Sequence, residues 1–593
     1  MTISPLDWGI ILAFFVISML IGVFTSRSAG KSSKDFFLSG RNMPWWLLGV
    51  SMVATTFSAD TPNLVTDIVR KNGVSGNWVW WAFLLTGMLT VFVYAKLWRR
   101  SEITTDLEFY EIRYGGKAAA FLRGFRAIYL GVFFNVVIMA TVSLAAIKIG
   151  GVMLGLEPIE TLLITGVVTV IYSSLGGLKG VLLTDFFQFF IAMAGSIGAA
   201  YYILDLPEIG SLNQLFSHPN VSDKLNLLPD FNDMNLIIPL LIMPIAIQWW
   251  ATWYPGAEPG GGGYIAQRML SAKDEKNAVG ATLLFNIAHY ALRPWPWIII
   301  ALSSLIIFPQ IQDMQAAFPH MPADKLGNDL AYSAMLTYLP NGLIGLVLAS
   351  LIAAVMSTLS THLNWGSSYV VNDFYLRFVK PEASEKELVA TGRISTVVLM
   401  VLAALLALAL SNALEAFNIL LQIGAGTGLI FILRWFWWRI NAYTEISAMI
   451  ISFLVALFFE VFNPRYEWIS IPDNMAYLKL LFGVGITTIT WLAVTLLTPP
   501  EKESILLAFY KKVHPAAYGW KKLLHKYPKE KVEQGQLPLE IGLMLTGSIA
   551  IYTTLFAIGF WVYGQIIAAG LATLVSIIGF VILFKNWKKI RFL

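Results

Sequence analysis

The chain has 593 residues, of which 57% are hydrophobic and only 13% are charged. Soluble globular domains carry about 25% charged residues, so this composition indicates a polytopic membrane protein. The sequence has no cysteine, which excludes disulfides, iron–sulfur clusters and thiol chemistry, and its net charge of +5 is not typical of a nucleic-acid-binding protein.

Fifteen segments are long and apolar enough to cross a membrane as helices. A span needs about 20 mostly apolar residues. The first segment follows MTISPLDWG, which lacks the basic start of a signal peptide, so we expect it to be retained. In chain order the candidates lie near residues 8–26, 45–69, 79–98, 120–147, 159–174, 181–203, 236–254, 279–308, 341–371, 392–411, 415–434, 443–462, 476–498, 540–563 and 567–585. The sequence therefore predicts an all-α polytopic membrane protein of about 15 transmembrane helices.

Lysine and arginine gather in alternate connections between these spans, and this pattern predicts the orientation of the chain. The basic connections are residues 27–41, 99–117, 268–276, 377–386 and 501–531, together with the tail at 585–591. The connection at 205–235 instead holds five acidic residues and one lysine. We therefore expect the N-terminus outside and the C-terminus inside. The basic linker at 499–538 is then cytoplasmic, and is either solvated or in contact with anionic membrane lipid.

Two spans contain residues that interrupt a helix. The span at 45–69 has a small, hydroxyl-rich centre followed by Pro62, and the span at 236–254 runs into Pro255, Pro259 and Gly260–Gly263. Five spans separate their starts, so the two enter the membrane in opposite directions. Broken helices at matching positions of two inverted halves are typical of the central site of a transporter. The alternatives are a simple proline kink and an ordinary cytoplasmic glycine loop.

The segment 351–364, LIAAVMSTLSTHLN, concentrates hydroxyl groups inside an apolar span. On a helix, Ala354, Ser357, Thr358 and Thr361 share one face, and Ser360 lies beside Ser357. Hydroxyl and carbonyl oxygens are the ligands that a small hard cation prefers. The alternative is that these hydroxyls bond to carbonyls of their own helix or join neighbouring helices.

Two aspartates lie inside predicted spans, where an ionisable residue is a functional candidate. Asp185 is expected near Ser360 and Thr361, where it would neutralise a bound cation; otherwise it pairs with Lys179 or an arginine near the cytoplasmic end. Asp60 either faces the solute or caps the second half of its broken helix.

Several stretches together resemble the sodium:solute symporter family. They are FFLSGRNMPWWLLGVSMVATTFSA, LEFYEIRYG, YSSLGGLKGVLLTDFFQ, YIAQRMLSAK and LIAAVMSTLSTHLNWGSSYVVNDFY, in this order. The resemblance covers roughly residues 8 to 440 and implies a LeuT-type fold with two inverted five-helix repeats. The implied organisation is a first helix in residues 1–30, repeats at 45–204 and 236–436, peripheral helices at 440–498, the linker at 499–538 and two C-terminal helices at 539–593.

The resemblance also implies positions for the coupling ion. A general sodium site would use the carbonyls of Ala54, Phe57 and Ala354 and the hydroxyls of Ser357 and Thr358. Some members have a second sodium site, and Asp185, Ser357, Ser360 and Thr361 match its pattern. Sodium is therefore the expected coupling ion, with one or two ions per transport cycle.

The expected solute site lies between the two broken spans and their neighbours. Its candidate residues are Thr56, Ser58, Asp60, Thr61, Asn77, Trp80, Gln248, Trp249, Trp253, Tyr264 and Gln422, with Tyr254 beside them. The resemblance assigns Tyr264 to an aromatic gate and Gln422 to a family glutamine, but most of the galactose-type recognition set is absent. Trp and Tyr rings stack on sugars and on cations; the alternative is that these tryptophans belong to interfacial belts.

These observations predict a sodium-coupled secondary active symporter in a cell membrane, the inner membrane of a bacterium. Its partners would be a small polar solute, sodium and membrane lipid. A sugar or sugar derivative is favoured over an amino acid or organic acid. Each sodium ion crossing inward gains about 2.3 kcal/mol per 100 mV. A sodium-independent facilitator or sensor of the same fold is the alternative, and the HExxH, GxSxG and Walker motifs of enzymes do not occur.

Overall fold

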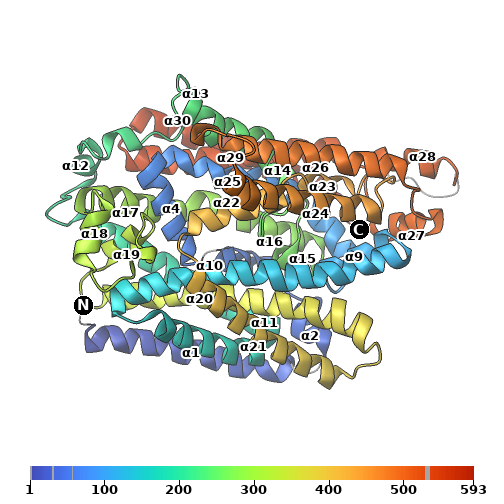
Figure 1. Ribbon diagram of the computed structural model, residues 1–593, viewed down its shortest axis with the longest axis horizontal. Helices are drawn as coiled ribbons and strands as arrows, with labels where there is room; N and C mark the ends of the chain where they lie inside the picture. The colour runs from blue at the N-terminus through green and yellow to red at the C-terminus, as the bar shows by residue number, and fades with distance from the viewer. Residues whose placement is uncertain (1–2, 30–31, 57, 528–534, 593) are drawn as a thin grey trace.

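The computed structural model describes residues 3–29, 32–56, 58–527 and 535–592 of the chain. The helices run mostly along the longest axis of the molecule, which is horizontal in Figure 1. The N-terminus lies at one end with α12 (Leu212–Ser217), and α27 (Glu503–Val513) and α28 (Lys521–Leu524) lie at the other end, towards which the C-terminus is placed. In the described ranges the only β-type pairing is a single bridge between Met43 and Ala272.

The long helices form the body of the molecule, and shorter helical turns join them. The N-terminal half contains α1 (Pro5–Ala29), α3 (Trp45–Thr56), α4 (Asp60–Asn72), α7 (Ala95–Ser101), α9 (Gly116–Ile128), η5 (Tyr129–Phe134), α10 (Asn135–Ile149) and α11 (Pro158–Leu204). The middle contains η8 (Ile238–Ile242), η9 (Pro244–Gln248), α14 (Trp249–Ala251), α15 (Gly263–Ser271), α16 (Glu275–Ile287), η10 (Ala288–Leu292), α17 (Pro294–Ile307), α20 (Leu343–Ser368), η12 (Tyr369–Val379) and α21 (Glu385–Ala409). The remainder contains α22 (Ala413–Gly424), α23 (Gly428–Leu433), α24 (Ala442–Leu457), α26 (Tyr477–Leu497), α29 (Leu537–Val562) and α30 (Ile566–Trp587).

Twelve helical segments of the described chain are long and apolar enough to span a membrane. The other three predicted spans are present as shorter pieces. Residues 45–69 are divided between α3 and α4, residues 159–174 form the first part of α11, and residues 415–434 are divided between α22 and α23. The expected count of about fifteen is therefore approximate, because a helix interrupted by a break or kink is too short in each part to count as a continuous span.

The first predicted break is present between α3 and α4. Helix α3 ends at Thr56 and α4 begins at Asp60, and residues 58 and 59 are not helical. Pro62 lies in the first turn of α4, where a missing N–H costs no helical hydrogen bond. The last carbonyls of α3 consequently have no following helical turn to bind.

The second predicted break is wider and follows α14. The chain leaves the helical conformation after Ala251 and returns to it at Gly263, where α15 begins. Gly256, Gly260 and Gly261 within this stretch have φ angles of +83°, +79° and +79°, which side chains other than glycine rarely adopt. The glycine-rich segment is therefore part of the helix break and not a remote loop.

Close contacts hold the two broken helices within the bundle. A Cβ on Gly49 of α3 would lie only 2.8 Å from the Ala281 carbonyl of α16, so glycine is what permits this approach. Helices α11 and α20 are joined where Tyr172 Oη donates to the Met356 carbonyl at 2.7 Å. At the periphery, Lys96 of α7 donates to the buried Glu540 carboxylate and fixes α29 to the first half of the chain.

Candidate functional site

The centre of the molecule contains an ion pair buried between four helices. Asp185 of α11 lies 3.5 Å from the Arg268 guanidinium of α15, and both side chains are completely buried. Ser51 of α3 donates to Asp185 Oδ2 at 2.5 Å, and Ser357 of α20 donates to Asp185 Oδ1 at 2.6 Å. Each oxygen of the carboxylate is therefore held by a hydroxyl from a different helix, while the arginine balances its charge.

The arrangement around Asp185 differs from the sequence-based expectation. The hydroxyl in contact with Asp185 is that of Ser357, whereas Ser360 donates to the Ser357 carbonyl at 3.0 Å. Thr361 accepts from Arg268 Nη2 at 2.8 Å. The guanidinium of Arg268 thus occupies the position beside Thr361 at which we expected the carboxylate. Asp185 therefore pairs with an arginine in this structure, and the second sodium site stays a prediction.

The hydroxyl face of α20 meets the end of α3 directly. Thr358 Oγ1 donates to the Thr55 carbonyl at 2.7 Å, and Thr55 Oγ1 lies 3.0 Å from Thr361 Oγ1. Ala54 and Ala354 are both buried on these two helices. Phe57, the remaining residue of the expected general sodium site, lies outside the described residues. Carbonyl oxygens freed at the end of α3 and hydroxyls of α20 are a donor set that suits a hard monovalent cation.

Polar side chains from the first break face the second broken helix. Thr56 Oγ1 donates to the Met52 carbonyl at 2.7 Å and lies 3.2 Å from Tyr264 Oη, so the predicted gate tyrosine contacts the first break. Thr61 Oγ1 donates to the Thr56 carbonyl at 3.4 Å. Asp60 is partly buried, Ser58 lies beside it, and Asp60 Oδ1 has no hydrogen-bond partner among the described residues.

Arg293 and His289 are functional candidates in this region that were not predicted from the sequence. Arg293, which is 1% exposed, donates from Nη2 to the Thr56 carbonyl at 3.1 Å and contacts the His289 ring. Trp80 packs edge-on against His289 and stacks on Tyr290, with ring centroids 5.7 and 5.9 Å apart. The stretch HYALRPWPW contained the signal, because an arginine inside an apolar span is a functional candidate in the same way as an aspartate.

The predicted solute-site residues do not all line one cavity. Asn77 positions Trp80 by accepting from its indole N–H at 2.8 Å. Gln248 and Gln422 line one cavity of about 640 Å³ between α4, η8, η9, α22 and α26. Trp249 instead donates to the Ile245 carbonyl within its own helix, and Trp253 packs edge-on against Phe134 at 5.2 Å. These two tryptophans are not among the residues that line the cavity.

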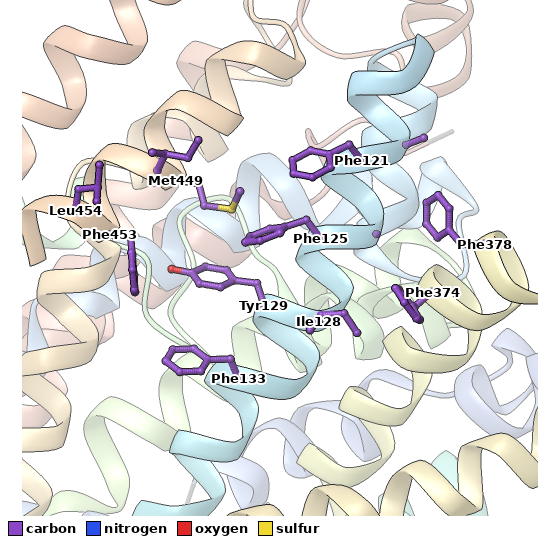
Figure 2. A pocket seen from close by; sticks show the side chains of 13 residues that line it. Phe121, Phe125, Ile128, Tyr129, Phe133, Phe374, Phe378, Met449, Phe453 and Leu454 are labelled. Carbon is purple, nitrogen blue, oxygen red and sulfur yellow. The ribbon is translucent and has the colours of Figure 1, made fainter. Parts of the chain in front are cut away.

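A larger groove of about 770 Å³ lies elsewhere, on the lateral surface between α9, η5, η12 and α24. Figure 2 shows Phe121, Phe125, Tyr129 and Phe133 along one side of it, with Phe453 and Leu454 opposite. Its lining is almost entirely apolar, and most of the aromatic side chains in it are partly exposed. A polar solute would find few hydrogen-bond partners there, so this groove is not a candidate solute site.

A bundle of apolar helices with two breaks that meet at buried ionisable and hydroxyl groups defines a membrane transporter. The sequence model of the sodium:solute symporter family matches residues 36–452, and the chain belongs to this family. It is a multi-pass membrane protein and a sodium-coupled symporter of a small solute, as predicted from the sequence.

Individual relatives are also sodium-coupled transporters by name. The chain is 26% identical over 542 residues to a sodium/glucose cotransporter of Vibrio parahaemolyticus, covering 87% of this chain and 96% of the relative. It is 26% identical to the rabbit sodium/myo-inositol cotransporter 2, covering 85% and 78%. It is 24% identical to the sodium/sialic acid symporter SiaT of Proteus mirabilis, covering 76% and 89%.

The fold is shared with a solved transporter. A Na⁺-coupled sialic acid symporter in a substrate-bound, outward-open state superposes with a TM-score of 0.64 at 19% identity, covering 84% of this chain and 99% of that one. The predicted all-helical LeuT-type fold is therefore confirmed.

Proposed function

We propose that this transporter imports a sugar or sugar derivative together with sodium, by alternating access, and that sodium binds where α20 faces the end of α3. The observation that carries the proposal is the bond from Thr358 to the Thr55 carbonyl, which brings the hydroxyls of α20 to the freed carbonyls of α3. The ligands would be the carbonyls of Ala54, Phe57 and Ala354 and the hydroxyls of Ser357 and Thr358.

Physical chemistry favours a cation at this position. The carboxyl-terminal end of α3 carries the negative end of its helix dipole, within the low-dielectric interior of the bundle. A sodium ion bridging α3 and α20 would order the break after Thr56, and the same break carries the solute-facing groups Thr56, Ser58, Asp60 and Thr61. Sodium would therefore favour the conformation that binds solute, which is all that coupling requires. No bond is made or broken in this cycle, so the chain acts as a carrier and not as an enzyme.

A second sodium ion at Asp185, Ser360 and Thr361 is a separate proposal. Arg268 already balances the Asp185 charge, so a second ion would bind only after the guanidinium moves away. Two ions would give a sodium Hill coefficient near two in uptake measurements, and Asp185→Asn would lower it towards one. A coefficient of one in the unmodified protein would reject the second site.

Three observations support a sugar as the solute. Trp80 and Tyr290 stack on each other and pack against His289, which contacts Arg293 at the first break, and such aromatic rings stack on the C–H faces of sugars. The cavity lined by Gln248 and Gln422 has room for a hexose. The relatives described above include transporters named for glucose, myo-inositol and sialic acid.

Purified protein in liposomes tests the proposal. We expect an inward sodium gradient to drive accumulation of a labelled sugar, and we expect collapse of that gradient by a sodium ionophore to abolish it. Equal uptake with and without the gradient would indicate a facilitator of the same fold.

A further inference from the structure

The charges around the first break bear on which sugars the site accepts. Arg293 approaches the break from the start of α17 and binds the Thr56 carbonyl. Asp60 begins the helix on the other side of the break, and its charge interacts with that of Arg293. One positive and one negative group therefore flank the first break.

The other charged groups near this site leave no positive charge in excess. Arg268 is balanced by Asp185. Glu258 is an additional buried acid within the second break; its Oε2 accepts from the Gly256 N–H at 3.0 Å, and its charge reaches Tyr254 and Tyr264. Arg293 is thus faced by Asp60 and Arg268 by Asp185, so the two arginines near the site are matched by two carboxylates, with Glu258 in addition.

We propose that the solute carries no acidic group: the site is built for an uncharged sugar or cyclitol and discriminates against uronic and sialic acids. The proposal rests on the proposed function, since it specifies the sugar class that the same site takes. A carboxylate entering this site would be desolvated without a spare cation to balance it. Asp60 would also repel it, because a carboxylate can only accept hydrogen bonds.

An uncharged polyol meets neither obstacle. Asp60 Oδ1 lacks a partner among the described residues and would accept a sugar hydroxyl, and a hydrogen bond to a charged acceptor is stronger than a neutral one. Trp80, held by Asn77, stacks on Tyr290, and both rings pack against His289, which contacts Arg293. A charged acceptor and aromatic rings therefore both lie near Arg293, a combination that suits a polyol.

Pairs of sugars in which a carboxylate replaces the neutral C6 hydroxymethyl group test the proposal. Sodium-dependent thermal stabilisation and competition for uptake would be measured with D-glucose and D-glucuronate, D-galactose and D-galacturonate, and with myo-inositol, N-acetylneuraminate and D-glucosamine. We expect at least one neutral compound to bind, and its acidic partner to bind at least tenfold more weakly. Stronger binding of an acid, or of the positively charged D-glucosamine, would overturn the proposal.

A charge-removing variant provides an independent measurement. Asp60→Asn leaves one negative charge fewer, so the ratio of acidic to neutral sugar affinity should rise at least tenfold, whatever happens to the absolute affinities. The control Asp223→Asn, at an exposed position of the short 3₁₀ helix Ser222–Lys224, should leave the ratio unchanged. An unchanged ratio in Asp60→Asn would overturn the proposal. If no sugar of any charge binds in the presence of sodium, the proposed function itself is wrong and this inference fails with it. Preferential binding of acidic sugars is a different result, which overturns this inference alone.

Discussion

At the level of single residues, the neighbouring hydroxyls of α20 have different partners. Ser357 binds the Asp185 carboxylate of α11, whereas Thr358 binds the Thr55 carbonyl of α3. A change at Ser357 therefore disturbs a buried ion pair as well as any ion site. A change at Thr358 removes only the hydroxyl of α20 that contacts the end of α3, so it is the cleaner probe of sodium binding.

Thr358→Ala should raise the sodium concentration for half-maximal uptake at least tenfold, because it removes one of five proposed ligands, and tenfold corresponds to about 1.4 kcal/mol. Thr358→Ser keeps the oxygen and should behave like the unmodified protein. Ser217→Ala, at the exposed last residue of α12, is the control. Unaltered sodium dependence in Thr358→Ala would argue against this site.

Asp185→Asn should destabilise the protein by about 3 kcal/mol, since it leaves a fully buried guanidinium without its counter-charge. The double variant Asp185→Asn with Arg268→Gln removes both charges and should recover much of the lost melting temperature. The two single variants and the double variant form a cycle measured by thermal unfolding in detergent. Additive losses in that cycle would contradict a direct pairing of the two residues.

Residue types and spacing were enough to predict the hydroxyl face of α20 and the contact of Asp185 with it, because helical periodicity determines which side chains share a face. The partner of Asp185 was not predictable, since Arg268 is distant in sequence and its position depends on how α15 packs after the second break. Arg293 and His289 were missed for a different reason: the prediction gave weight to acids as cation ligands and passed over a base within an apolar span.

At the level of helices, the two breaks form one unit. Tyr264 lies in the first turn of α15, after the second break, and its hydroxyl contacts Thr56 at the end of α3. The position of that hydroxyl depends on Gly256, where a Cβ would lie 2.1 Å from Tyr264 Oη. Glycine there is required for both the positive φ angle and the space.

Gly256→Ala should reduce the maximal rate of uptake at least fivefold, because the new methyl group displaces the Tyr264 hydroxyl from the first break. Gly564→Ala provides a matched control: Gly564 also has a positive φ, +71°, but a Cβ there meets nothing within 4 Å. Uptake by both variants would be compared at equal amounts of folded protein. A similar loss in both would assign the effect to backbone strain and not to Tyr264.

Both breaks were predictable because proline, glycine and short hydroxyl residues interrupt helices for local reasons. The boundary between residues 159–174 and 181–203 was predictable for a similar local reason. The backbone between them is not helical at Gly177, where φ is +53° and ψ is −164°, so these residues form two helices within α11, as predicted.

At the level of the whole molecule, the basic linker and the acidic connection at 205–235 lie at opposite ends of the bundle (Figure 1). This arrangement agrees with an outside N-terminus and an inside C-terminus, which stays a prediction from the distribution of lysine and arginine. The cysteine-free sequence makes it directly testable, since any introduced thiol is the only one present.

A membrane-impermeant maleimide should label Asp223→Cys in intact cells and Lys526→Cys only after the membrane is permeabilised. Both positions are exposed in the structure, so accessibility to the reagent depends on the side of the membrane and not on burial. Labelling of Lys526→Cys in intact cells would reverse the predicted orientation.

The cavity between α4 and α22 also has a consequence for the solvent. At about 30 Å³ per molecule of liquid water, a space of about 640 Å³ holds on the order of 20 waters. If the solute binds there, as proposed, a hexose displaces only part of this content, and closure of the cavity would expel the remainder. Turnover should therefore depend on water activity: a high concentration of an osmolyte too large to enter would favour the closed conformation and slow the return of the empty carrier to the open one.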